Sequence, residues 1–403
     1  MKIDKYLSIS FYMRQGNNNG NFLVNLILLF CIVSAIAIAL SIASLTKSSQ
    51  NNSNIIVNNN STFDWREASF SPIYSPYSDI ISDEDYYPYV VYDSLSFSGH
   101  GSSYKYKMWH QGTIGSISIS YSNDGITWIL NGSTNLSPGY HACVLYSNNK
   151  FNGTIDHFYR IWYWTGNAGL IVDVIKTAES DDGITWVNIQ SVTQNPFFPL
   201  VDGITPGLLF HLYGPGFIYY NTQSTNITGA PYTYPYVLFY DIASEGFGPG
   251  TSSEGIGLAY SLDGFNWTRY NPLPIPILIP DGCPGGFCWD LTHAYRPSLI
   301  IDSNNKTYPY HLYYSASNDD ILSGLIYAHG IGHAISTDGV TWSIDYRNPI
   351  FYYNNPVPWR SGRTYTPFVL NFNGTLVMWF SGGSSDIYGQ NGSIGYATCT
   401  NCL

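Results

Sequence analysis

The chain has 403 residues, of which 11% are charged and 17% are aromatic, including 36 Tyr and 11 Trp. Tyr, Trp and Phe favour strands, so the composition indicates an all-β protein with enough aromatic side chains to bury a large core. It excludes an intrinsically disordered chain, and the net charge of −11 disfavours nucleic-acid binding.

Three segments are expected before the folded body. Residues 22–45 contain no charged residue, and a helix of this length spans a hydrocarbon core of about 30 Å. Basic residues precede it, so residues 1–21 are expected to be a cytoplasmic tail and the body to be extracellular. A cleaved signal peptide is the alternative, although its apolar region is normally only about 7 to 15 residues. Residues 46–62 are rich in Asn and Ser, which predicts a flexible stalk.

Two sequence features fit an exported glycoprotein. The close pairs Cys283/Cys288 and Cys399/Cys402 are expected to form disulfides, with zinc ligation by the same four residues as the alternative, and Cys143 is expected to be buried. Asn-x-Ser/Thr acceptor sequences follow the apolar segment, although a chain rich in Asn, Ser and Thr also forms them by chance. The acceptors are Asn51, Asn59, Asn60, Asn131, Asn135, Asn152, Asn226, Asn266, Asn305, Asn373 and Asn391.

The body is organised by a motif, S-x-D-G-x-[TN]-W, that occurs four times, at residues 122–128, 180–186, 261–267 and 336–342. Asp-Gly between two strands supplies the positive φ angles of a tight hairpin, and the following Trp is expected to pack between neighbouring units. The four Asp residues are therefore assigned to structure. Three strand-like segments precede each motif, so each unit has four strands, A to D, as in a propeller blade.

A fifth unit starts at Thr366 and stops after Ala397, without the motif or a strand D. Residues 63–73 resemble the strand D segments of the other units, so the start of the body is expected to supply the missing strand. The sequence therefore predicts an all-β, five-bladed β-propeller over residues 63–403, preceded by an N-terminal transmembrane helix.

The face on which strands A begin is expected to carry the functional site, because long loops converge there. These loops are acidic and aromatic. Aromatic rings stack on the apolar faces of sugars and carboxylates bond sugar hydroxyls, so a neutral polysaccharide is the expected ligand. Acidic loops that are merely solvated are the alternative.

The repeated A-x-S-x-D-G-x-x-W units, the Tyr-rich strands B and the strand start Arg296-Pro297-Ser298-Leu299 resemble the five-bladed propeller glycoside hydrolases of families 43, 32, 68 and 130. The resemblance covers residues 63–403. In family 43, a base Asp precedes the Pro that opens strand A of blade one, and a Glu-Gly-Pro motif opens blade three. Here Tyr87 and Tyr213 occupy these places, and His141 lies where a third carboxylate would fall, so the usual catalytic motifs are not preserved.

Glycoside hydrolysis usually needs two carboxyl groups about 5 to 9.5 Å apart. The substitutes in this chain are Asp85 as base, Glu254 or else Glu245 as acid, with Glu254 preferred, and Asp290 as a third carboxylate. Arginines near the strand A starts are expected to hold a carboxylate by bidentate pairing. The predicted substrate-binding residues are His141, Tyr213, Trp289, His293, Arg296, Arg363 and Tyr365.

No metal or cofactor site is predicted, because His329 and His333 are four apart in a strand-like run, where that spacing gives no shared helical face. Two functions stay open. The first is a membrane-anchored extracellular propeller that binds and hydrolyses a glycan. The alternative is a non-catalytic cell-surface propeller that binds glycans or protein partners.

Overall fold

The computed structural model describes residues 64–69, 71–73, 86–98, 103–112, 115–165, 175–192, 210–221, 231–244, 253–271, 276–280, 289–318, 328–352, 357–384, 392–400 and 402–403. Ser61–Leu403 forms one compact unit. The predicted tail, membrane span and stalk lie outside the described residues. Within the described ranges, no helix combines the length and the apolar character needed to cross a bilayer.

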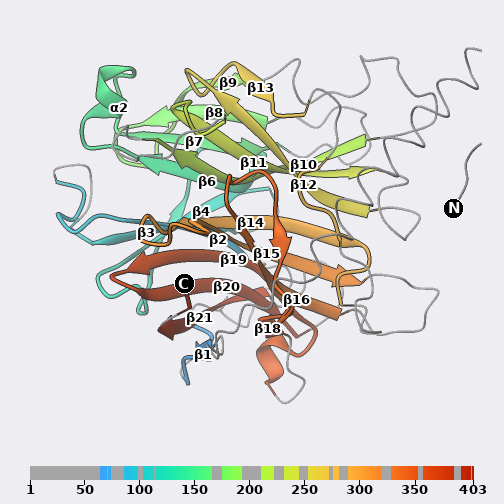
Figure 1. The fold of residues 1–403 in the computed structure, drawn as a ribbon. Coiled ribbons are helices and arrows are strands. Elements are labelled where there is room, and N and C mark those ends of the chain that lie inside the picture. The colour runs from blue at the N-terminus through green and yellow to red at the C-terminus, as the bar shows by residue number, and fades with distance from the viewer. Residues whose placement is uncertain are drawn as a thin grey trace, which may run out of the picture. The chain divides into compact units, whose positions relative to one another are not determined.

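The strands of the described residues form four sheets that make up five antiparallel blades, because a parallel bridge between β12 and β14 joins blades three and four into one nine-stranded sheet (Figure 1). This confirms the predicted all-β propeller. Two short helical segments, α2 (Lys150–Gly153) and η4 (Pro358–Arg360), lie outside the blades. In chain order the strands are β2 (Tyr86–Tyr92), β3 (Tyr106–Gln111), β4 (Ile117–Ser122) and β5 (Ile129–Ser133) in blade one; β6 (Tyr140–Tyr146), β7 (Tyr159–Trp164), β8 (Ile175–Ser180) and β9 (Val187–Ser191) in blade two; β10 (Phe210–Tyr220), β11 (Tyr236–Ser244), β12 (Ser253–Ser261) and β13 (Trp267–Arg269) in blade three; β14 (His293–Ile301), β15 (Tyr310–Asn318), β16 (Ala328–Ser336), β17 (Ser343–Ile344) and β18 (Phe351–Tyr352) in blade four; and β19 (Arg363–Phe372), β20 (Thr375–Gly383), β21 (Gly392–Thr400) and β1 (Arg66–Glu67) in blade five.

The ring closes in the predicted way. Strand β1, from the start of the body, pairs antiparallel with β21, with Arg66 opposite Thr398 and Glu67 opposite Ala397. Glu67 also forms a 2.6 Å ion pair with the buried Arg360 of η4. The fifth blade therefore combines the two ends of the body, joined by main-chain bonds and a largely buried ion pair.

The Asp-Gly turns have the predicted structural role. In the first copy, Asp124 Oδ1 accepts the backbone N–H groups of Ile126 (2.8 Å) and Thr127 (2.7 Å), and Gly125 has a φ of 76°. The same pair of bonds recurs at Asp182, Asp263 and Asp338. Although partial burial opposes ionisation, these N–H groups hold the pKa of all four carboxyls below its ordinary value.

Each Asp-Gly turn also binds the blade before it. Trp109 of blade one donates its indole N–H to the Gly183 carbonyl in the turn of blade two at 2.9 Å. Three other interfaces repeat this contact, with donors Trp162 (to Gly264, 2.8 Å), Tyr232 (to Gly339, 3.0 Å) and Trp379 (to Gly125, 2.8 Å). The motif thus shapes a hairpin and presents a carbonyl to the neighbouring blade.

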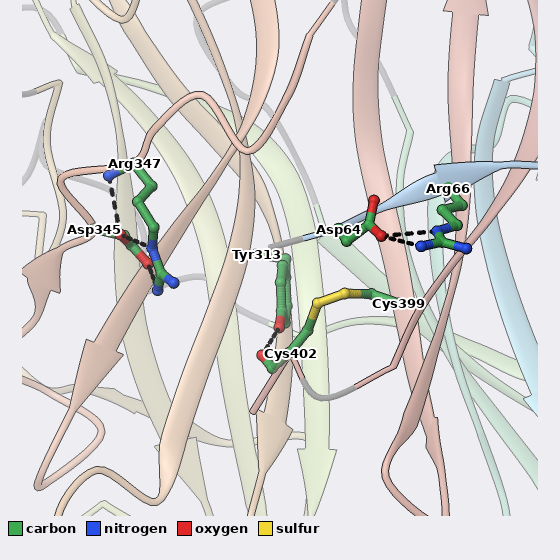
Figure 2. Close-up of a disulfide and its surroundings, with 7 residues drawn as sticks. All are labelled: Asp64, Arg66, Tyr313, Asp345, Arg347, Cys399 and Cys402. Atoms are coloured by element: carbon green, nitrogen blue, oxygen red, sulfur yellow. Dashed lines mark hydrogen bonds and ion pairs between the residues drawn. A yellow bond between two sulfur atoms is a disulfide. The ribbon is translucent and has the colours of Figure 1, made fainter. Parts of the chain in front are cut away.

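Blade five has no Asp-Gly turn, and the C-terminal segment takes its place. Tyr313 of β15 donates its hydroxyl to the Cys402 carbonyl at 3.4 Å, and its ring meets Trp65 edge-on at 5.8 Å. Cys402 is bonded to Cys399 at the end of β21, as predicted (Figure 2). Cys143 is free and buried, also as predicted, whereas Cys283 and Cys288 lie outside the described residues. The disulfide therefore holds the carbonyl that completes the ring of contacts between blades.

Replacing Cys399 and Cys402 with Ser is expected to lower the free energy of unfolding. A bond that closes so short a loop removes about 2 kcal/mol of chain entropy from the unfolded state, and its loss also frees the carbonyl that Tyr313 binds. Chemical denaturation measures the change. The single Cys399→Ser variant should lose as much as the double variant, and an unchanged midpoint in both would contradict this role.

Lys107 of β3 is buried and supports the same interface as Trp109. Its amine donates to the Asp182 carbonyl at 2.9 Å and lies 4.6 Å from the centre of the Tyr159 ring. Burial lowers the pKa of this amine to about 8, although Asp182 opposes the shift. The charged amine therefore costs stability at neutral pH.

The stability difference between the wild type and Lys107→Met is expected to move in favour of the wild type as pH rises from 7 to 10. Between the folded pKa near 8 and the unfolded value of 10.5, the unfolded chain holds more protons, so deprotonation stabilises the fold. The expected change is about 2 to 3 kcal/mol. Urea unfolding of both proteins at several pH values measures it, and parallel pH profiles would contradict the shift.

Candidate functional site

Five residues with positive φ surround the central axis, one in the first half of each strand A. Each sits at a β-bulge, and four of the five directly precede a proline. Residues other than Gly rarely adopt this conformation, and such strained positions cluster at functional sites. The five, here called the inner ring, are Tyr87 (59°), His141 (53°), Gly214 (108°), Arg296 (49°) and Thr366 (49°).

A small cavity opens at the inner ring, and all five blades line it. Because the ring lies in the first half of each strand A, this end of the propeller, here called the mouth, is the face predicted to carry the site. The cavity has room for only a few water molecules. As the described residues form it, the cavity is too small to enclose a sugar ring, and a bound sugar is expected on its rim.

Strand B of each blade places one side chain behind the inner ring. Three of these side chains accept the backbone N–H of a ring residue in the next blade: Asp241 from Arg296 (2.9 Å), Ser315 from Thr366 (2.6 Å) and Ser381 from Tyr87 (3.0 Å). The equivalent positions in blades one and two, each two residues after the strand B tryptophan, are Gln111 and Trp164. Asp241 is the one charged member of this set.

Arg296 fills the centre of the mouth. Its guanidinium forms a 2.8 Å ion pair with Asp241, donates to the Pro215 carbonyl at 2.9 Å and bonds His141 across the axis. It also lies 4.9 Å from the centre of the Tyr87 ring. Complete burial raises the pKa of Asp241, while Arg296 opposes the shift. The pair links blades one to four at their innermost points.

Beside Arg296, blades one and two form a continuous surface of partly exposed rings, here called the aromatic platform. Tyr87 meets Tyr86 at 4.5 Å and His141 at 4.3 Å, and His141 stacks on Trp164 at 5.2 Å with an interplanar angle of 12°. Tyr140 completes the platform, 5.4 Å from Trp164. Four of these five rings come from the first two residues of β2 and β6, where each strand bulges outward.

The opposite side of the mouth is polar. Glu254 of β12 lies opposite His293 of β14 in the parallel bridge that joins blades three and four. His293 lies opposite Ser317, and Ser317 opposite His329, so the four side chains form a row across four strands. Burial raises the pKa of Tyr87, and among the neighbouring charges Glu254 adds to the shift while Arg363 opposes it. The row therefore borders the same site as the platform.

The structure brings together five of the predicted residues: His141 and Arg296 bond directly, Glu254 and His293 are strand neighbours, and Arg363 acts electrostatically on the same Tyr87. Tyr365 is buried, with its ring 6.1 Å from that of Tyr87. Asp290 is almost completely buried.

Trp289 packs in the core at 2% exposure, 6.3 Å from the Tyr314 ring, so it offers no stacking surface to a sugar. Asp85 and the side chain of Tyr213 lie outside the described part of the chain. The separation between Asp85 and Glu254 therefore stays a prediction. Asp241, Tyr86, Tyr87, Tyr140 and Trp164 were not among the predicted site residues.

Asp241→Asn is expected to destabilise the protein strongly, by about 3 to 5 kcal/mol, because it leaves the buried Arg296 guanidinium without a counter-charge. Pairing it with Arg296→Met should recover most of the loss. Asp64→Asn is the matched control, because the Asp64–Arg66 pair is exposed and should contribute nothing measurable. Equal effects of Asp241→Asn and Asp64→Asn on urea unfolding would refute the central role of the pair.

The comparisons with known proteins show the fold. Neither protein-family models nor curated proteins gave a match to the sequence. Among solved structures, a thermostable family-43 glycoside hydrolase is 16% identical, with 80% of this chain and 91% of that one aligned and a TM-score of 0.50. A structure from work on the GH130 family of mannoside phosphorylases is 12% identical, with 86% and 96% aligned and a TM-score of 0.52. A BT0996 RGII complex is 16% identical, with 80% and 92% aligned and a TM-score of 0.53. The protein thus has the fold of the five-bladed propeller glycoside hydrolases, without their usual catalytic motifs.

Proposed function

We propose that the protein binds a glycan at the mouth of the propeller and acts as a glycan-binding module, not as a hydrolase. The aromatic platform carries this proposal. Its rings are partly exposed, contact one another edge to face, tilted or stacked, and reach the cavity through Tyr87 and His141. The C–H face of a sugar ring is apolar and stacks on such a surface, while the Glu254–His293 edge offers hydrogen bonds to hydroxyl groups.

Three observations favour binding over hydrolysis. The cavity below the rim is too small for a sugar ring, and Arg296 with Asp241 occupies the axis where the blades converge. The positions at which the related hydrolases carry the base and the acid hold Tyr87 and Tyr213. The names of two similar structures, an RGII complex and enzymes that target β-1,2 mannosidic linkages, support carbohydrate as the ligand class.

Hydrolysis is the second candidate, and the strand register gives it one specific basis. Asp241 lies opposite Ile256 in the β11–β12 pair, so Glu254, two residues from Ile256, projects from the same face of the sheet as Asp241. The backbone positions of such diagonal neighbours lie about 7 to 8 Å apart, which would let their carboxyl groups reach a separation that glycosidases use. Glu254→Gln should abolish any release of reducing sugar that the wild type shows.

The site is proposed to face the outside of the cell, with residues 22–45 as the membrane anchor and residues 46–62 as the stalk. The acceptor sequences for N-glycosylation and the Cys399–Cys402 disulfide support this location. Protease added to intact cells should remove the propeller and leave the anchor. Protection of the propeller would contradict the topology.

Trp164→Ala and Tyr86→Ala are each expected to weaken glycan binding by about tenfold or more, which corresponds to about 1.4 kcal/mol of lost stacking. The measurement is a titration of the protein against the glycan that an array of plant, fungal and bacterial polysaccharides identifies. Tyr104→Ala is the matched control, because Tyr104 is also partly buried and stacks on Tyr121, but it lies where β3 begins, away from the mouth. If Tyr104→Ala weakens binding as much as the platform variants, the proposed site is wrong.

A further inference from the structure

The acceptor asparagines of the described residues fall into groups with different surroundings. Strand A of every blade starts at the inner ring and runs away from it, so the A-to-B connections all lie on the opposite end of the propeller, here called the far face. Asn152 lies in this connection in blade two, Asn305 in blade four and Asn373 in blade five. Three acceptors from three blades therefore share one face, which is the face opposite the mouth.

The side-chain amides of these three residues suit modification. Asn305 uses only its carbonyl oxygen, which accepts the backbone N–H groups of Thr307 (3.1 Å) and Tyr308 (2.9 Å). Asn152 likewise accepts through its oxygen, from Asn149 at 2.7 Å, and is exposed. Asn373 is exposed at the tip of the β19–β20 hairpin. Since N-glycosylation joins the sugar to the amide nitrogen, the bonds at Asn152 and Asn305 survive the modification.

Asn135 differs, although its sequence motif is equally complete. It follows β5 in blade one, and its amide bridges two blades. The nitrogen donates to the Trp186 carbonyl at 2.9 Å and the oxygen accepts the Trp186 N–H at 2.8 Å. This reciprocal pair uses the hydrogen on the same side of the amide as the oxygen, which is the position that the sugar carbon takes in a trans amide. A glycan on Asn135 would break the bridge.

Two other acceptors are not assigned to either group. Asn266 lies in the C-to-D turn of blade three, also at the far-face end, but its amide nitrogen is used, because it donates to Asp263 Oδ2 at 2.8 Å where the other copies carry Thr. Asn131 is exposed in the outermost strand of blade one, between the two faces. Asn226 and Asn391 lie outside the described residues.

We propose that Asn152, Asn305 and Asn373 carry N-linked glycans and that Asn135 does not. The inference rests on the proposed extracellular location, because glycosylation requires export. The sugars then cover the far face and leave the mouth open to its ligand. The modification is covalent attachment of a sugar C1 to the amide nitrogen, with loss of one amide hydrogen and of the donor's lipid phosphate leaving group.

The test is glycopeptide mass spectrometry of the full-length protein, purified in folded form from its own membranes. Peptides with Asn152, Asn305 and Asn373 are expected to carry glycans, and the Asn135 peptide is expected to be unmodified. Asn152→Gln should lower the mass of the intact protein by one glycan, while Asn135→Gln should leave the glycan mass unchanged. A glycan on Asn135 in folded protein, or bare asparagines at all three far-face positions, would overturn the assignment.

The acceptor asparagines of the predicted stalk distinguish a wrong assignment of the far-face residues from a wrong extracellular location. Glycans on Asn51, Asn59 or Asn60 with none on the far face would show that the chain is exported and that the assignment of the far-face residues is wrong. A chain without any glycan, in a host that glycosylates a reporter fused after residue 62, would overturn the assignment in the same way. A reporter without glycans would overturn the extracellular location and, with it, this inference.

Discussion

The contact between an aromatic donor in one blade and a backbone carbonyl in the next supports the rest of this structure. It is made by an indole N–H or a phenol O–H and is buried, so it carries the directionality of a hydrogen bond together with the burial of a large ring. The Asp-Gly turn supplies the carbonyl in four blades. In the fifth, the disulfide-linked Cys402 supplies it. The motif therefore recurs within the chain because it determines both a hairpin and an interface.

Since these outer contacts hold the blades, the inner ends of strands A are free to differ. The same strained position carries Tyr, His, Gly, Arg and Thr in successive blades. This variation produces an asymmetric mouth, with rings on the side of blades one and two and polar groups on the side of blades three to five. Arg296 joins the two sides. A closed ring that is symmetric in its scaffold thus presents an asymmetric binding surface.

The sequence predicted the fold well because the fold depends on local patterns. The Asp-Gly motif, the Tyr-rich strands and the missing strand after Ala397 led to five blades and to closure by residues 63–73, and the pairing of Arg66 with Thr398 confirms it. The site was predicted only in part. His141 and Arg296 were found because they start a strand A, whereas Asp241 and Trp164 lie inside strands B. An alignment of the five strands B identifies both positions, because Asp241 lies two residues after Phe239 and Trp164 two residues after Trp162.

Trp289 shows the limit of reading a ligand site from residue type. It directly precedes an acidic residue, Asp290, yet its ring fills the core beside Gly332, where an added methyl group would meet it at 2.7 Å. Whether a Trp side chain is exposed or buried depends on which neighbouring blade packs against it. This packing is determined only in the closed propeller. Trp164 is partly exposed at the end of β7, whereas Trp289 is buried.

The most direct test of the proposed binding site is a crystal structure of the protein with an oligosaccharide from the glycan that it binds most tightly. We expect a sugar ring to lie across Tyr86, Tyr87 and Trp164, with hydroxyl groups toward Glu254 and His293 and with the Arg296–Asp241 pair intact beneath it. An oligosaccharide bound to the far face, or one that displaces Arg296 and enters the central cavity, would contradict this expectation.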